Sequence, residues 1–160
     1  MRIVLSRVIE GRKDSTIAQL IEQIDARLRE AAIRLTRGRR EVVDTLARAR
    51  GPVSAAEIQM HLDGAVPLSS IYRTLGVLTQ TDVASLHHSR DGVTRYELAE
   101  PLQQHHHHLV CISCGRIDDV EFAAEAEAIV QEVVAGVASD RGFIAVNHAL
   151  EIEGTCEECS

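Results

Sequence analysis

Apolar residues recur every three or four positions through the first half of the chain, which predicts a series of amphipathic helices. The second helix begins after Thr36, a good N-cap, and ends before Gly51-Pro52. Ser54 and Glu57 have the spacing of a capping box and predict a short third helix. A fourth helix begins near Pro67. The first helix begins near residue 14 and places five aliphatic residues on one face: Ile17, Leu20, Ile21, Ile24 and Leu28.

The period then changes to two, which predicts strands over residues 83–88 and 93–98 joined by a turn over residues 89–92 that contains Asp91-Gly92. Helices followed by a two-stranded hairpin are typical of a winged helix-turn-helix, with residues 69–79 as the recognition helix. A plain helical bundle, with Arg73 as a solvated surface charge, is the alternative. The candidates for DNA contact lie near the start of that helix: Ser69, Ser70, Tyr72, Arg73 and Thr74.

A different pattern follows a linker over residues 100–104. We expect strands over 107–111 and 116–121, a helix over 123–138 and a last strand over 144–153, which places His148 on an apolar face. The fold class is therefore α+β: a winged-helix domain over residues 1–99, with no assignment for 1–13, and an α/β domain over 105–160. The second-domain helix is expected to turn five apolar residues inward: Ala126, Ile129, Val130, Val133 and Val137.

Charge separates the same two halves. The 160 residues carry a net charge of −7, but residues 1–100 hold 15 Arg/Lys against 13 Asp/Glu, whereas residues 101–160 hold 2 against 11. Eight arginines and only three acidic residues lie within residues 27–50. Such asymmetry favours a nucleic-acid-binding first half, with Arg37, Arg39 and Arg40 near the DNA backbone. A basic surface without a partner is the alternative.

All four cysteines lie in two C-x-x-C pairs, Cys111/Cys114 and Cys156/Cys159. Two such turns can complete a closed tetrahedral zinc site, which is structural because it leaves no open position. Disulfides or free thiols are the alternatives. Residues 1–13 lack the apolar core of a secretory leader, and we see no membrane span, so we expect a cytoplasmic chain with reduced thiols.

Four consecutive histidines, residues 105–108, lead directly into the first cysteine pair. On an extended strand His105 and His107 point one way and His106 and His108 the other. The run therefore predicts two different metal sites rather than one. A solvated polar run is the alternative for the stretch, and a satisfied core histidine is the alternative for His148.

These motifs together resemble the ferric uptake regulator (Fur) family. The resemblance covers residues 35–159 and rests on VSAAEI, SSIYRTL, YEL, HHHHLVCISCG, VEF and NHALEIEGTCEEC. It implies a dimeric, metal-dependent repressor with an N-terminal DNA-binding domain and a C-terminal dimerisation domain. The residues implied are Cys111, Cys114, Cys156 and Cys159 for structural zinc; Glu97, His106, His108 and Glu121 for a hinge sensor site; His105, His107, Glu127 and His148 for a second site; and Tyr72 and Arg73 for DNA.

Three positions depart from the family pattern. Pro52 stands where many members place a sensor histidine, His107 stands where iron sensors often have Asp, and Ala99 stands where zinc sensors often have Cys. The regulatory metal is therefore Fe(II) or Zn(II), with Mn(II) and Ni(II) open. Peroxide sensors often have Asp in place of Glu121, which disfavours peroxide sensing. His87 or His88 of the wing is the candidate for the missing ligand, with two solvated histidines as the alternative.

The sequence thus predicts a repressor that binds a palindromic operator as a metal-loaded homodimer and controls iron or zinc uptake. A peroxide-, manganese- or nickel-sensing member is the nearest alternative. A zinc-dependent hydrolase and a metal-storage protein are more distant ones. The chain carries no H-E-x-x-H motif, and we assign no catalytic residue.

Overall fold

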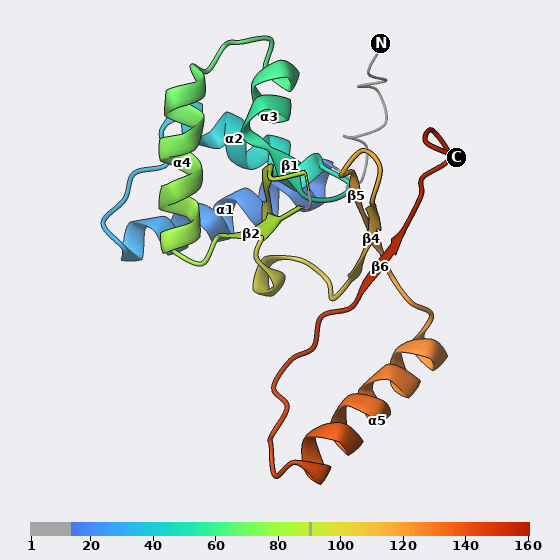
Figure 1. Cartoon of the computed structure of the whole chain (residues 1–160). Coiled ribbons are helices and arrows are strands. Elements are labelled where there is room, and N and C mark those ends of the chain that lie inside the picture. The colour runs from blue at the N-terminus through green and yellow to red at the C-terminus, as the bar shows by residue number, and fades with distance from the viewer. Residues whose placement is uncertain (1–13, 90) are drawn as a thin grey trace. The chain divides into compact units, whose positions relative to one another are not determined.

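The computed structural model describes residues 14–89 and 91–160, which fall into two compact units that divide between Gln104 and His105 (Figure 1). Expectations for residues 1–13, and for Arg90 in the wing turn, lie outside the described residues. Helix and sheet are mixed, which confirms the α+β class. Unit 1 covers residues 1–104 and unit 2 covers residues 105–160.

Four helices of unit 1 form where their sequence signals predict: α1 (Asp14–Glu30), α2 (Arg37–Arg48), α3 (Ala55–His61) and α4 (Leu68–Gln80). The Thr36 hydroxyl accepts a hydrogen bond from the Arg39 backbone N–H and caps α2. Ser54 and Glu57 form the complete capping box of α3. The five predicted residues of α1 are at most 8% exposed, so its apolar face lies in the core.

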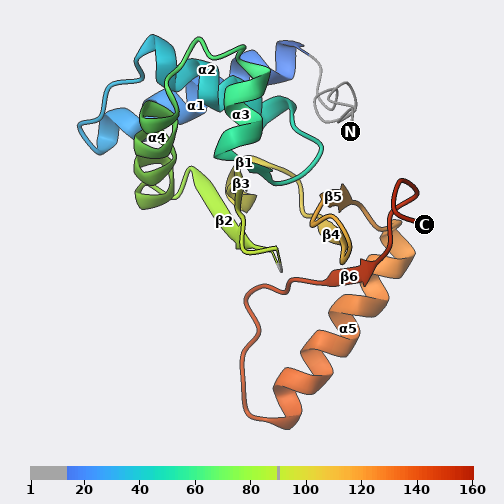
Figure 2. The ribbon, with the colours of Figure 1, turned by 45° about the horizontal axis from the view of Figure 1, so that its top comes forward.

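The wing is a hairpin of β2 (Ala84–His88) and β3 (Thr94–Leu98), closed by a hydrogen bond from the Gly92 N–H to the Ser89 carbonyl. A two-residue strand, β1 (Val53–Ser54), adds to the other edge of β3 and gives the order β1-β3-β2 (Figure 2). This strand was not predicted because two residues are too few to show a period. Helices α3 and α4 with this sheet make the winged helix-turn-helix.

Unit 2 contains a small mixed sheet of order β5-β4-β6 and one helix. Strand β4 (His107–Cys111) pairs antiparallel with β5 (Ile117–Val120) and parallel with β6 (Glu151–Gly154). The parallel pairing aligns the two cysteine-bearing turns at one end of the sheet. Helix α5 (Ala124–Asp140) follows β5, and the expected linker holds a 3-10 turn (Glu100–Leu102).

Two expectations for unit 2 are wrong. The last strand covers only residues 151–154, because its ladder with β4 begins at the pair His108↔Glu151 and residues 144–150 have no strand partner in the described chain. Helix α5 buries none of its residues. Its apolar face is exposed, and so are apolar residues of the segment after it. Together these residues are here called the α5 surface: Ile129, Val133, Val137, Phe143, Ile144 and Val146, all at least 60% exposed.

No helix among residues 14–89 and 91–160 combines the length and the apolar character needed to cross a bilayer.

Candidate metal centres and nucleic-acid interface

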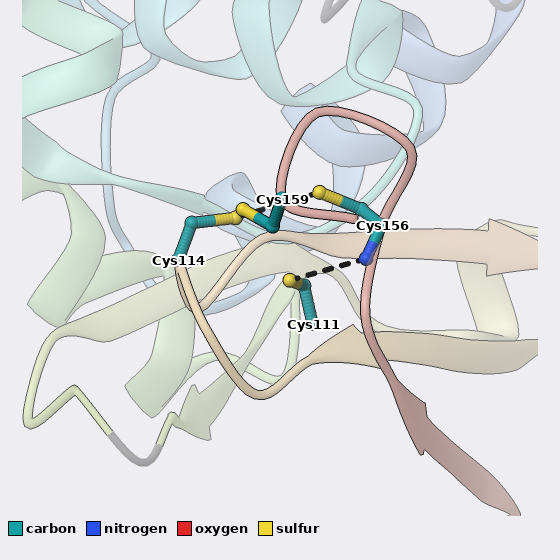
Figure 3. A group of neighbouring side chains, drawn as sticks. All are labelled: Cys111, Cys114, Cys156 and Cys159. Atoms are coloured by element: carbon teal, nitrogen blue, oxygen red, sulfur yellow. Dashed lines mark hydrogen bonds between the residues drawn. The ribbon is translucent and has the colours of Figure 1, made fainter.

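The four cysteines converge at one end of the unit 2 sheet (Figure 3). Cys111 ends β4, and a tight turn leads to Cys114, with the Gly115 N–H bonded to the Cys111 carbonyl at 2.9 Å. Gly115 has a φ of 72°, a conformation that costs glycine little. The loop after β6 brings Cys156 and Cys159 to the same place, and all four sulfurs lie within 4.8 Å of one another.

Their spacing fits zinc rather than disulfides. All four cysteines are free, and the Sγ atoms of Cys114 and Cys156 are 3.8 Å apart. A tetrahedral zinc with Zn–S bonds of about 2.3 Å holds its sulfurs about 3.8 Å apart. The donor set therefore fits a closed four-sulfur zinc site.

The ionisation of these thiols also calls for a cation. The Cys156 backbone N–H donates to Cys111 Sγ and lowers the pKa of Cys111 to about 6. The pKa of Cys159 is raised to about 12, because its thiol is hydrogen-bonded to the sulfurs of Cys156 and Cys114. Four thiolates this close repel one another, so the complete set ionises when a divalent ion compensates the charge.

A second cluster combines His105, His107, Glu127 and His148, whose donor atoms lie within 4.8 Å of one another. His107 lies on β4 and His105 just before it, whereas Glu127 comes from the start of α5 and His148 from the segment before β6. His107 Nε2 is 2.9 Å from Glu127 Oε2, and His148 Nε2 is 3.1 Å from Glu127 Oε1. The hydrogen bond from His107 lowers the pKa of Glu127 and favours its carboxylate.

Two imidazole nitrogens of this cluster face each other: His105 Nε2 and His148 Nε2 are 3.3 Å apart. A tetrahedral metal with bonds of about 2.0–2.1 Å to nitrogen separates its ligand atoms by about 3.3 Å. Three imidazoles and one carboxylate suit Zn(II), Fe(II) or Ni(II), so the cluster fits a transition metal.

A third group lies on the opposite face of β4. His106 Nε2 and His108 Nε2 are each 3.7 Å from Asp119 Oδ1 on β5. The four histidines therefore alternate between the two faces of β4, as expected for an extended strand. The acidic partner is Asp119, not the predicted Glu121, which is exposed and belongs to no such group among the described residues.

The register of the hairpin explains the correction. His108 pairs directly with Asp119, so their side chains share a face, whereas Glu121 lies beyond the last paired residue of β5. Counting outward from the Cys111–Cys114 turn would have given Asp119 from the sequence. The acidic residue beside the two histidines is therefore an aspartate, and this position does not disfavour peroxide sensing.

Glu97, the sensor ligand expected in unit 1, lies on β3 of the wing. His87 Nε2 is 2.7 Å from Glu97 Oε1, and the Ser85 hydroxyl donates weakly to the same oxygen at 3.5 Å. His88, the next residue, is on the other face of β2, is exposed and contacts Thr94 Oγ1 at 3.5 Å. Of the two wing histidines, the described structure brings only His87 to Glu97.

The recognition helix α4 and the start of α2 border an open groove of about 690 Å³. Arg37, Arg39 and Arg73 line it, and Arg73 donates to Ser70 Oγ at 3.1 Å. The Arg37 side chain is 93% exposed although it pairs with Glu41 at 3.1 Å. Three guanidinium groups around one concavity suit a phosphate backbone.

The other candidates for DNA contact differ in how exposed their side chains are. Ser69, Tyr72 and Arg73 are exposed, and Tyr72 retains 54% of its surface. Thr74 is only 6% exposed because it lies on the core side of α4, between Ile71 and Leu75. Thr74 nevertheless lines the same groove as Arg73, so its contact with DNA stays a prediction.

A winged helix with a basic groove, joined in one chain to donor sets for transition metals, defines a metal-dependent DNA-binding regulator. Residues 30–153 match the model of the Ferric uptake regulator family, and the chain belongs to this family. It is a metal-responsive transcriptional regulator and not an enzyme, so the hydrolase hypothesis is set aside.

Individual relatives agree with this family. The chain is 31% identical over 145 residues to the ferric uptake regulation protein of Bacillus subtilis (strain 168), covering 88% of this chain and 94% of the relative. It is similar, with a TM-score of 0.70 and 25% identity over 96% of each chain, to the Helicobacter pylori ferric uptake regulator Fur, which has three functional metal-binding sites. A zinc-bound manganese uptake regulator is similar with a TM-score of 0.63 and 26% identity, covering 88% of this chain and 98% of that one.

Proposed function

We propose that the chain is a cytoplasmic repressor that binds a palindromic operator as a metal-loaded homodimer and controls iron or zinc uptake. The observation that carries this proposal is the pairing of a basic recognition groove in unit 1 with three separate donor groups in unit 2. The Helicobacter pylori relative has three functional metal sites, which supports the same number here.

The three groups have different tasks in this proposal. The four cysteines hold structural Zn(II), because a closed thiolate shell exchanges metal slowly and leaves no open position. His105, His107, Glu127 and His148 hold a second metal that joins α5 and the segment before β6 to β4. Glu97, His106 and His108 belong to the regulatory site, an assignment that rests on the family resemblance. Asp119 joins them because it faces both histidines.

The regulatory donors contain no thiolate. Imidazole and carboxylate ligands suit Fe(II), Mn(II), Ni(II) and Zn(II). Pro52 and Ala99 stand where other family members often have a metal ligand, so these positions do not indicate which metal is bound. We propose Fe(II) or Zn(II). The regulatory metal acts by binding one arrangement of the two units more tightly than others, which shifts the population toward the DNA-binding form.

The homodimer is proposed to form through the α5 surface. Six large apolar side chains at least 60% exposed on one small unit form a patch typical of an interface. A dimer also supplies two recognition helices related by a two-fold axis, which matches a palindromic site.

The decisive experiment combines native element analysis with DNA binding after titration of each metal into regulatory-metal-free protein. We expect sequence-specific binding to a palindromic duplex only after Fe(II) or Zn(II) is added. Equal binding with and without metal would contradict the proposed function.

The basic groove gives a residue-level prediction. Arg73→Ala should weaken specific binding by about 1–3 kcal/mol if Arg73 reads a base edge. Arg37→Ala should weaken all duplexes alike and flatten the salt dependence, because it contacts phosphate. Fluorescence anisotropy against operator and scrambled duplexes at several salt concentrations checks both. Unchanged operator affinity in Arg73→Ala would remove the recognition-helix assignment.

Peroxide sensing is the second candidate function, and Asp119 favours it because aspartate stands at the acidic position beside His106 and His108. The test is treatment with dilute peroxide before the DNA-binding measurement. A peroxide sensor should lose binding when loaded with redox-active Fe(II) and keep it when loaded with Zn(II).

A further inference from the structure

The winged-helix unit lacks the imidazole that the family pattern places at residue 52. Pro52 has no donor atom, residues 1–104 contain no cysteine, and their only histidines are His61, His87 and His88. Any nitrogen or sulfur ligand from this unit must therefore come from one of these three side chains.

Only one of the three lies beside a carboxylate already expected to bind metal. His87 and Glu97 project from neighbouring strands on one face of the wing sheet, with Nε2 and Oε1 2.7 Å apart. Both side chains are largely covered, at 21% and 10% exposure. His61 lies in the last turn of α3 and His88 on the opposite face of β2, and both are exposed.

The neighbours of the pair are arranged to tolerate a cation. Arg95 stands directly opposite His87, but its guanidinium turns along the strand to Asp91, 3.0 Å away. This ion pair compensates the positive charge of Arg95 and lowers the pKa of Asp91. Ser85 contacts the same Glu97 oxygen as His87, which fixes the orientation of the carboxylate.

A metal fits between the two donors after a small adjustment. With bonds of about 2.0–2.1 Å, adjacent ligand atoms are about 2.9 Å apart in an octahedral site and about 3.3 Å apart in a tetrahedral site. The present 2.7 Å is that of a hydrogen bond, so rotations that part the atoms by a few tenths of an ångström are sufficient.

We propose that His87 is a ligand of the regulatory metal and supplies, with Glu97, the whole share of that site contributed by the DNA-binding unit. The proposal rests on the proposed function and deepens it. It makes the wing, rather than the segment before α3 that contains Pro52, the part of unit 1 that responds to metal. Metal binding then acts directly on the hairpin whose other end borders the recognition helix.

The test uses the full chain with its structural zinc and with the second cluster removed by His105→Ala/His148→Ala, so that Co(II) titration reports the regulatory site. In this background His87→Gln keeps a hydrogen-bond donor for Glu97 but removes a good metal ligand. His88→Gln is the matched control, one residue away on the opposite face. Tyrosine fluorescence, from Tyr72 and Tyr96 in unit 1 alone, verifies that the wing unit stays folded.

We expect His87→Gln to lower Co(II) affinity at least about tenfold, a loss typical even of residues that only support a ligand. His88→Gln should equal the background. His87→Cys should restore binding and add a thiolate-to-Co(II) charge-transfer band, which a merely structural hydrogen bond cannot produce.

Equal Co(II) affinity in His87→Gln and His88→Gln, with no charge-transfer band in His87→Cys, would overturn the proposal. Failure of this inference is distinguishable from failure of the proposed function. In the first case the unmutated chain still binds DNA in a metal-dependent way, and in the second it does not.

Discussion

The two units of the chain differ in how many of their apolar side chains they bury. In the described part of unit 1, nineteen buried hydrophobic residues form one continuous core between four helices and the wing sheet. In unit 2 the buried hydrophobic residues are Val110, Cys111 and Ile117, and one of these is itself a proposed metal ligand. Unit 1 is held together by apolar burial, whereas unit 2 presents donor atoms and an exposed apolar surface.

This difference indicates where each unit obtains its stability. Burial of an aliphatic side chain stabilises a fold by roughly 1.5–3 kcal/mol. Unit 1 gains this stabilisation from contacts among its own residues. Unit 2 is too small for such a core, and small domains of this kind depend on metals or oligomerisation. We therefore expect the stability of unit 2 to depend on the structural zinc and on protein concentration. In protein free of the regulatory metal, the stability of unit 1 should be largely indifferent to both.

The largest expected effect is the loss of the cysteine site. Cys156→Ser should destabilise unit 2 by several kcal/mol, because in such sites metal-binding free energy is folding free energy. Circular dichroism should show an early transition, while tyrosine fluorescence, which reports unit 1 alone, should keep its midpoint. Ser113→Ala, within the other cysteine turn, is the control. Folded wild-type protein with four titratable thiols and no zinc would show the site to be wrongly assigned.

The reverse experiment acts on the core of unit 1. Ile58 on α3 is 0% exposed, so Ile58→Ala should cost about 2–5 kcal/mol through lost burial and the cavity left behind. In protein free of the regulatory metal, the tyrosine-detected transition should move, and removal of the structural zinc by added chelator should not move it further. Met60→Ala, on the same helix and 42% exposed, should cost much less. A chelator-dependent shift of the tyrosine signal would mean that the two units do not unfold independently.

The smallest of the three effects concerns the α5 surface. Val133→Glu should raise the dissociation constant of the dimer at least about tenfold, a change of about 1.4 kcal/mol. Ala128→Glu adds the same charge to another side of α5 and serves as control. Sedimentation at several protein concentrations measures the dimer, and zinc content should be unchanged. Equal dimerisation in the two variants would place the interface elsewhere.

The same contrast explains what the sequence could predict. The elements of unit 1 follow from local signals, such as the Thr36 cap, the Ser54–Glu57 capping box and the 3.6-residue period of α1. These signals agree with the core that the elements form, so the helices and the wing were predicted nearly to the residue. The missed strand β1 is stabilised by pairing with β3, a contact distant in sequence.

Unit 2 was harder to predict, because its apolar pattern does not correspond to side chains buried within the same unit. The period of α5 correctly indicated a helix, but the side expected to face inward has nothing in this unit to cover it. The strand expected over residues 144–153 formed only from residue 151 onward for the same reason, since alternation without a partner strand makes no ladder. The error at Glu121 differs: strand pairing, which places Asp119 opposite His108, was the better guide than the motif letters.

The parallel pairing of β6 with β4 has a consequence for synthesis. A ribosome delivers the chain from its N-terminus, so unit 1 can fold while unit 2 is still being made. His148, Cys156 and Cys159 complete two of the three donor groups, and all three emerge after the winged helix. A nascent or truncated chain can therefore possess a finished DNA-binding fold without the structural metal, and the structural zinc is acquired only by molecules translated through Cys159.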